Sequence, residues 1–259
     1  MRRWDYPRCM PSAPQEAGSD RDQSRAGKSS APRYAVYWAP PAGCALAQLG
    51  ERWLGRDAAT GRALRQPTLA GFSGAEVALI TASPRRYGLH ATLKPPFHLA
   101  SPYAPADLQA RLASFAKMQP RFRAAALRVS GLANFLALTL QAPSPALHAL
   151  AARCVEALDC FRRAPDDEEL ARRRRCGLTP RQQENLRRWG YPYVMDEFRF
   201  HVSLTGAIDR DTAGRLQPTL AEYFAVSTSA PLQISEIALF VEPRAGAPLR
   251  ILHRYGLAR

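Results

Sequence analysis

Two short stretches of the sequence decide the fold: GLHATLKPPF, residues 88–97, and RFHVSLTG, residues 199–206. Each stretch reads as a strand and places a histidine two positions before a hydroxyl residue. The four residues are His90 and Thr92 in the first stretch, and His201 and Ser203 in the second. Side chains two positions apart on a β-strand project from the same face. Each strand is therefore predicted to present an imidazole and a hydroxyl together, while the apolar residues between them point into a core.

The segments that follow the two histidines have the same predicted order of strand, helix, strand and strand. After His90, the pattern predicts a helix over 105–118 and strands in RFRAAALRVSG and NFLALTLQA. After His201, it predicts a helix over 209–225, despite its internal proline, and strands in PLQISEIALFVEP and PLRILHRYGL. This internal repeat predicts a duplicated α+β fold. Two such strands opposed about an approximate twofold axis would form a cleft with two imidazoles and two hydroxyls.

The rest of the chain is organised around these two units. Residues 1–32 are polar, rich in Pro, Ser and Gly, and lack hydrophobic periodicity, so they are predicted to be a disordered tail. A single domain is predicted over 33–259, starting with a strand in RYAVYWAP and a helix over 42–55. Its parts are a first histidine unit at about 86–142, a helix and insert at about 144–197, and a second histidine unit at about 198–256. Within the middle part we expect a long helix over 144–163 and an insert that covers an edge of the fold rather than acting as a lid.

Composition bounds the class of protein and its partners. The chain has 259 residues, of which 46% are hydrophobic, enough for one large domain or two fused lobes. A formal net charge of +14 attracts anionic partners, whether phosphate esters, nucleotides or nucleic acid. Lysine occurs only at positions 28, 94 and 117, so Lys94 beside the first motif is a notable cation. The Arg172–Arg175 run follows acidic residues and is predicted to be a charge-paired helix face.

The sequence also predicts the compartment. No window is apolar enough to span a membrane, and the start lacks the apolar region of a secretory signal. Five cysteines are scattered without metal-binding or disulfide spacing. We therefore expect reduced thiols in a cytoplasmic protein that does not bind membranes. The sequence does not indicate an oligomeric state.

The paired motifs suit phosphodiester chemistry. One neutral imidazole can remove a proton from a nucleophile while the other, protonated, gives a proton to the leaving oxygen. Thr92 and Ser203 can donate hydrogen bonds to the non-bridging oxygens of the phosphate. No metal or cofactor is expected, because the motifs carry no carboxylate or thiol at ligand spacing. The G-x-S-x-G motif of serine hydrolases is also absent from the sequence.

Further side chains are candidates for substrate binding. The strand period places Lys94 on the face of His90 and Thr92, and it places Arg199 and Thr205 on the face of His201. Tyr37 is an aromatic candidate, together with three residues available for stacking on a base: Trp189, Tyr191 and Tyr193.

The motifs resemble the two-histidine (2H) phosphoesterase superfamily, which includes 2′-5′ RNA ligase-like proteins and cyclic phosphodiesterases. The strings RYAVYWAP, YGLHATLKPPF, LTPRQQENLRRWGYPYV and EFRFHVSLTG are similar to a bacterial branch found with phosphonate-utilisation genes. The resemblance implies a bilobal fold of two antiparallel sheets with outer helices and an active site in the central cleft. It also implies that His90 and His201 are the acid/base pair, with Thr92 and Ser203 as phosphate-binding hydroxyls.

The resemblance implies a substrate class as well. The branch suggests a small ribose cyclic phosphate, such as a ribosyl 1,2-cyclic phosphate, while the residues alone indicate only a phosphodiester. We therefore expect a metal-independent cyclic phosphodiesterase acting on a small phosphorylated molecule. One alternative keeps the chemistry but takes RNA with a 2′,3′-cyclic phosphate or a 2′-5′ linkage. A second alternative is a non-catalytic binder of phosphorylated ligands.

Overall fold

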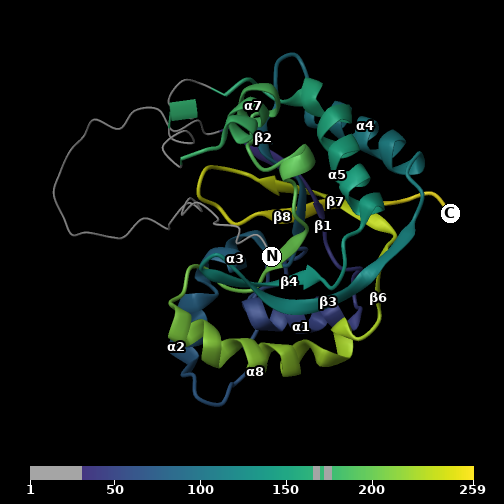
Figure 1. Cartoon of the computed structure of the whole chain (residues 1–259). Coiled ribbons are helices and arrows are strands. Elements are labelled where there is room, and N and C mark those ends of the chain that lie inside the picture. Colours follow the sequence, from purple (N-terminus) through teal and green to yellow (C-terminus); the bar gives the residue numbers. More distant parts are fainter. Residues whose placement is uncertain (1–30, 166–169, 172–176) are drawn as a thin grey trace.

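The computed structural model of the chain describes residues 31–165, 170–171 and 177–259. The predicted disordered tail (1–32, apart from its last two residues) and the Arg172–Arg175 run lie outside the described residues. The described part consists of two antiparallel sheets with helices packed around them (Figure 1).

Each sheet has four strands, and every paired neighbour runs antiparallel. The first sheet has the order β2-β1-β7-β8, with β2 (Ala91–His98), β1 (Arg33–Trp38), β7 (Glu236–Glu242) and β8 (Arg250–Gly256). The second has the order β5-β4-β3-β6, with β5 (His201–Ser203), β4 (Phe135–Leu140), β3 (Phe122–Leu132) and β6 (Pro231–Ile234). The predicted α+β fold with two antiparallel sheets is confirmed.

The helices lie outside the sheets in two groups. Near the second sheet are α1 (Ala45–Leu54), α2 (Gly74–Ile80), α3 (Ala82–Tyr87) and α8 (Arg210–Thr228). On the opposite side of the molecule in Figure 1 are α4 (Pro105–Lys117), α5 (Pro145–Ala157) and α7 (Pro180–Trp189). Short 3-10 turns occur at η1 (Asp159–Phe161) and η2 (Met195–Glu197). Helix α8 packs on β3 and β4, and α5 packs on β2.

Local sequence signals explain several helix boundaries. Helix α7 in the insert begins with Thr179, whose side chain accepts from the Gln182 N–H while the Gln182 side chain accepts in return. The helix ends at Gly190, which has a left-handed φ of 72°. The long helix predicted over 144–163 is shorter, because α5 ends at Ala157 and η1 follows. The helix predicted over 209–225 continues to Thr228.

The two repeats exchange strands between the sheets. Strands β3 and β4, which follow the His90 strand, pair in the sheet of His201. Strands β7 and β8, which follow the His201 strand, pair in the sheet of His90. The segment PLQISEIALFVEP, predicted as one strand, therefore divides at Ser235, since β6 stays in the second sheet and β7 crosses to the first. Neither sheet is a separate stretch of sequence, so neither repeat can fold alone as one lobe.

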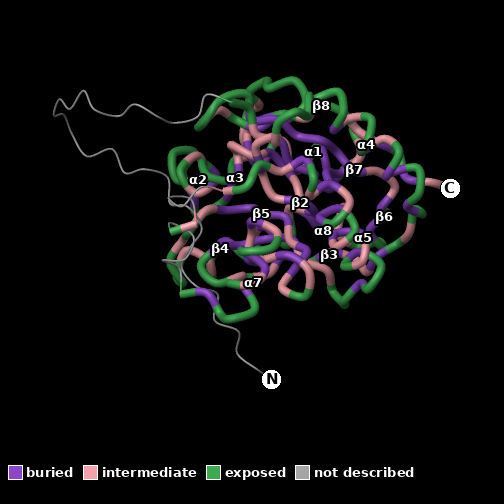
Figure 2. Tube along the Cα trace, turned by 90° about the horizontal axis from the view of Figure 1, so that it is seen from above, coloured by how far each residue is buried: buried purple, intermediate pink, exposed green. Residues whose placement is uncertain are grey.

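Most buried side chains belong to one core between the sheets and helices, and Figure 2 shows buried strands at the centre with exposed segments outside. The indole Nε1 of Trp53 in α1 donates to the carbonyl of Leu204 at 2.7 Å, which ties that helix to the end of β5. A smaller buried cluster, including Tyr37 and Phe240, covers the other face of the first sheet. Among the described residues, every helix is too short or too polar to cross a bilayer.

Candidate active site

His90 lies directly before β2, in a turn that depends on glycine. Gly88 follows α3 with a φ of 78°, a conformation that L side chains rarely adopt. A Cβ at this position would lie 2.5 Å from the Cβ of Ala58. The Gly88 carbonyl lies 2.9 Å from Nδ1 of His90. Because a carbonyl only accepts, Nδ1 carries the hydrogen, and Nε2 is left as the atom that can take or give a proton.

His201 has the same arrangement in the second sheet. Its Nδ1 lies 2.9 Å from the carbonyl of Arg199, which is again the residue two positions earlier. Nδ1 is again the donor, so Nε2 is again the atom available for chemistry. The repeated sequence motif is therefore also a repeated hydrogen-bond geometry, and it fixes the same tautomer in both rings.

The two histidines lie at strands that meet, since His90 directly precedes β2 and His201 begins β5. Strand β2 is an edge strand of the first sheet, β5 is an edge strand of the second, and the two contact each other. The charge of a protonated His201 lowers the pKa of His90, which is an effect of close approach. The contact between the strands therefore places the two residues predicted as the acid/base pair at neighbouring sheet edges.

Aromatic side chains surround His90 more closely than His201. The ring of Tyr37 stacks on His90 with centroids 4.0 Å apart and planes 28° apart. Tyr87 and Phe240 lie at 5.8 and 6.2 Å from the same ring. For His201, the ring contact is Phe135, tilted at 5.8 Å. His90 is therefore held in a largely apolar surrounding.

Burial shifts the pKa values of both histidines in the same direction. Desolvation lowers the pKa of His90 from 6.5 to about 4, against an opposing contribution from its hydrogen bond to Gly88. Desolvation also lowers the pKa of His201, again opposed by its backbone hydrogen bond. Both imidazoles are thus neutral at pH 7 without a bound anion. Each can act as a base, and one must gain a proton before it can act as an acid.

Both hydroxyl residues lie in the strands next to the histidines, Thr92 in β2 and Ser203 in β5. Thr92 pairs with Tyr37 across β2 and β1, and Ser203 pairs with Ala137 across β5 and β4. Both hydroxyl residues are partly exposed. His201 and Ser203 share one face of β5 by strand alternation.

Lys94 does not share the face of Thr92, and this prediction is wrong. Tyr37 pairs with Thr92 but Val36 pairs with Lys94, so β2 contains an extra residue at a bulge. The bulge turns Lys94 to the opposite face, where it is 1% exposed. Its Nζ donates to Asp159 Oδ1 and to the Val155 carbonyl, both at 3.2 Å. The side chain joins β2 to the end of α5.

Thr205 also fails to share the predicted face, because β5 ends at Ser203. The Thr205 hydroxyl accepts from the Leu136 N–H at 3.0 Å and donates to the Gly206 carbonyl at 2.8 Å. It is 2% exposed, so it stabilises the end of the strand.

The remaining two candidates have mixed outcomes. Arg199 is exposed, and its carbonyl orients His201. Burial lowers the pKa of His148 on α5, and the charge of Arg199 lowers it further. A substrate-binding role for Arg199 stays a prediction. Tyr37 is 1% exposed and packs on His90, so it supports the imidazole rather than presenting an open stacking surface.

Three site residues were not predicted from the sequence. Gly88 could have been found, since a glycine two positions before the motif histidine marks a turn. Tyr87 lies next to it, but nothing in the pattern indicates the stacking direction of its ring. Phe240 reaches His90 only because β7 crosses into the first sheet, which the strand pattern does not reveal.

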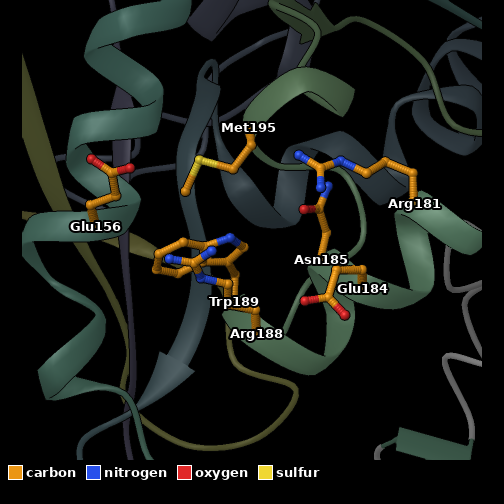
Figure 3. Close-up of a pocket in the computed structure, with 7 residues that line it drawn as sticks. All are labelled: Glu156, Arg181, Glu184, Asn185, Arg188, Trp189 and Met195. Atoms are coloured by element: carbon orange, nitrogen blue, oxygen red, sulfur yellow. The ribbon is translucent and has the colours of Figure 1, made fainter.

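Two surface hollows lie away from the histidines. The first, of about 240 Å³, is formed by α5, α7 and η2 (Figure 3), and is lined by Glu156, Arg181, Glu184, Asn185, Arg188, Trp189 and Met195. The guanidinium of Arg188 lies over the Trp189 ring at 4.6 Å. Trp189, a predicted candidate for stacking on RNA bases, therefore lies in this hollow. The second hollow, of about 360 Å³, lies between α4 and α5. The central cleft between the lobes stays a prediction.

The described residues include no group of three or more His, Cys, Asp or Glu placed to hold a metal ion. A neutral Nε2 can take a proton from water, a protonated Nε2 can give one to an oxygen, and the hydroxyls can donate to an anion.

Comparison with known proteins gives a family match and longer relatives. The family described as "Protein of unknown function (DUF1045)" matches residues 92–250. A protein of Janthinobacterium sp. (strain Marseille) called "Ribose 1,5-bisphosphate phosphokinase PhnN" is 37% identical over 228 residues, covering 86% of this chain and 50% of the relative. A protein of the same name from Laribacter hongkongensis (strain HLHK9) is 37% identical over 219 residues, covering 85% of this chain and 50% of the relative. The chain spans about half the length of these curated relatives.

Solved structures also match. Escherichia coli LigT complexed with phosphate covers 89% of this chain over its whole length, with 14% identity and a TM-score of 0.39.

Proposed function

The chain belongs to the DUF1045 family, and we propose that it is a cyclic phosphodiesterase in which His90 and His201 perform general acid/base catalysis without a metal. The observation that carries the proposal is the repeated histidine geometry. Each ring bonds through Nδ1 to the carbonyl two residues earlier, at 2.9 Å, and so keeps Nε2 for proton transfer. Two histidines with purely structural roles would not be expected to repeat this hydrogen bond at two strands that meet.

We propose that His90 is the base, because of the surroundings of the two rings. His90 stacks on Tyr37 and lies near Tyr87, and burial lowers its pKa to about 4. A protonated His201 lowers that pKa further, so the pair holds its first proton on His201. His90 is therefore the base and His201 the acid.

The reaction follows from these roles. Nε2 of His90 takes a proton from a water molecule as its oxygen forms a bond to phosphorus. The bond from phosphorus to one ring oxygen breaks, and Nε2–H of His201 gives its proton to that oxygen. The products are a phosphate monoester and a neighbouring hydroxyl. Thr92 and Ser203 donate to the non-bridging oxygens, where negative charge accumulates.

Substrate binding supplies the charge state that this reaction needs. Both histidines are neutral at pH 7 in the free protein, because burial lowers both pKa values. A bound phosphodiester is an anion, and an anion beside an imidazole raises its pKa. Binding therefore favours protonation of His201, while His90 stays neutral within its aromatic surroundings.

The relatives support a ribose phosphate as the substrate. This chain matches half of proteins that are named for ribose 1,5-bisphosphate. We propose that the half of each relative matched by this chain acts on a ribose phosphate related to the one in the relative's name. We therefore assign a small ribose cyclic phosphate, opened to a ribose phosphate monoester. The protein acts in the cytoplasm in this proposal, and Cys44, Cys154 and Cys160, the cysteines within the described residues, are free thiols.

A turnover screen tests the function. Purified protein is incubated with ribose 1,2-cyclic phosphate, nucleoside 2′,3′-cyclic phosphates and RNA bearing a 2′,3′-cyclic end, and products are read by phosphorus NMR. The proposal expects ring opening of the small ribose substrate, in the presence of EDTA, and its loss in His90→Ala. Faster opening of the RNA ends would show that the substrate is RNA rather than a small ribose cyclic phosphate. Binding of these molecules without any turnover would show that the protein binds phosphorylated ligands but is not an enzyme for them.

A further inference from the structure

The face of the first sheet that carries Tyr37 also carries a pair of arginines. Arg33 of β1 and Arg86 of α3 both bond to the carboxylate of Glu242, through Nε and Nη2. The Glu242 side chain is fully buried, whereas the arginine side chains are 29% and 35% exposed. One carboxylate thus holds two cations that reach the surface, and the group is net positive.

The positions of these arginines are fixed from several sides. Glu242 lies opposite Arg33 in the β1–β7 pairing, and its Oε1 also accepts from the Gly246 N–H at 3.0 Å. The main-chain carbonyl of Arg86 accepts from the Leu249 N–H at 2.8 Å and from Arg56 at 3.3 Å. Two guanidiniums hold the Glu242 carboxyl ionised, with its pKa below the ordinary value. The pair is therefore preorganised rather than mobile.

The arginine pair lies next to the surroundings of His90. In the register of β1 and β7, Arg33 and Glu242 come two residues beyond Ala35 and Phe240 on the same face. The guanidinium carbon of Arg86 lies 5.6 Å from the Tyr87 ring centre, and that ring lies 5.8 Å from the His90 ring centre. The sum of these two distances is the upper limit for the separation of the Arg86 guanidinium carbon and the imidazole centre. A single sugar ring with a phosphate at each end spans a gap of this order.

The cations also have donor capacity that Glu242 does not use. Each guanidinium has five N–H donors, and those bonded to Glu242 leave others free to point to a ligand. The buried Nε of Arg86 has no hydrogen-bond partner within the described part of the chain. Both arginine side chains are partly exposed and keep N–H donors that Glu242 does not use, and these donors indicate a site for an anion.

We propose that Arg33 and Arg86 bind a second, non-reacting phosphate monoester of the substrate while His90 and His201 act on the cyclic phosphate. The inference rests on the proposed function and narrows it to a ribose cyclic phosphate that is phosphorylated at its other end. Guanidinium groups bind phosphate oxygens through charge-assisted, often bidentate hydrogen bonds. Glu242 positions both groups and does not touch the ligand.

The experiment compares two substrates in matched variants. Turnover of ribofuranose 1,2-cyclic phosphate and of its 5-phosphorylated form is measured for the wild-type protein, Arg86→Gln and Arg33→Gln. Arg254→Gln is the control, because Arg254 also pairs with a carboxylate, Glu236, in the same sheet. In parallel, calorimetry measures the binding of ribose 5-phosphate to each protein, with ribose as the reference ligand.

The expected result is a wild-type preference for the 5-phosphorylated substrate in kcat/KM. Arg86→Gln and Arg33→Gln each reduce that preference about tenfold or more, as expected for loss of a charge-assisted hydrogen bond, and Arg254→Gln keeps it. Equal turnover of the two substrates by the wild-type protein would leave the phosphodiesterase function intact and overturn the second phosphate site. An equal loss for both substrates in Arg86→Gln would show a structural role and also overturn it. If neither substrate is opened, the proposed function fails, and the calorimetry decides: weaker ribose 5-phosphate binding in Arg86→Gln supports the site, and unchanged binding overturns it.

Discussion

Replacing His90 by glutamine should make the folded protein less sensitive to acid. His90 has a pKa of about 4 in the folded chain, against 6.5 in the unfolded chain, because burial disfavours the charged ring. Between these values the unfolded chain binds more protons than the folded one, so stability falls as the pH falls through this window. The full shift corresponds to about 3 kcal/mol. About 2 kcal/mol of this develops between pH 7 and pH 4.5.

Urea denaturation of wild type and His90→Gln at both pH values measures this contribution. Other groups that titrate over the same range are present in both proteins and cancel in the difference of differences, except His201, whose charge is coupled to His90. The wild-type protein should therefore lose about 2 kcal/mol more than the variant on acidification. His253→Gln, which removes an exposed histidine from β8, is the control and should follow the wild type. Equal losses in wild type and His90→Gln would refute the claim that the fold holds His90 neutral.

Three other predictions follow from the site. The pH profile of kcat/KM should be bell-shaped with its maximum below pH 6.5, because burial lowers the pKa of both histidines. The kcat profile should lie at higher pH, because a bound anion raises the pKa of a neighbouring imidazole. A kcat/KM maximum above neutral pH would contradict this. Gly88→Ala should lower kcat/KM by about tenfold or more, since its Cβ would meet Ala58 at 2.5 Å and displace the carbonyl that holds His90. Gly61→Ala is the matched control, with a φ of 79° and open space around it, and a similar loss in both variants would argue against positioning by the Gly88 turn. Lys94→Met should leave KM within about twofold, because Lys94 is buried on the face opposite Thr92. The same substitution should change the free energy of unfolding by about 1–3 kcal/mol. A large rise in KM in a folded variant would show that Lys94 binds the substrate.

The sequence is informative where strand alternation acts locally. His201 and Ser203 share a face because they lie two residues apart on a regular strand, and the repeated pattern alone is enough to indicate both histidines. The helix over 42–55 is predictable from its apolar spacing, and α1 occupies nearly the same residues. The two antiparallel sheets are implied by the resemblance and are present.

Pattern reading fails where pairing with another strand changes the alternation. The bulge that turns Lys94 away depends on how β2 pairs with β1, and no feature of the local pattern marks it. Ser235 divides two strands because they belong to different sheets, although the apolar pattern continues across it. The aromatic contact of Phe240 with His90 likewise depends on strand exchange. Residues far apart in the sequence meet only through the three-dimensional arrangement of the strands.

The cluster of Arg33, Arg86 and Glu242 also depends on how distant strands pair. Arg33, Arg86 and Glu242 are scattered along the sequence, and their meeting follows from the β1–β7 register and the position of α3. In an arginine-rich chain, no single arginine stands out from its sequence context. The sequence thus indicates the groups proposed to react but not the groups proposed to select the substrate.

The most direct test of the acid/base pair is the single-turnover rate of cyclic phosphate opening in His90→Ala, His201→Ala and the double variant. Circular dichroism first confirms that each variant is folded. If the two imidazoles act in one step, each single variant should lose at least about a hundredfold in rate, and the double variant should lose little more than either alone, because residues that act as a unit are not additive. Either single variant retaining near wild-type turnover would contradict the two-histidine account.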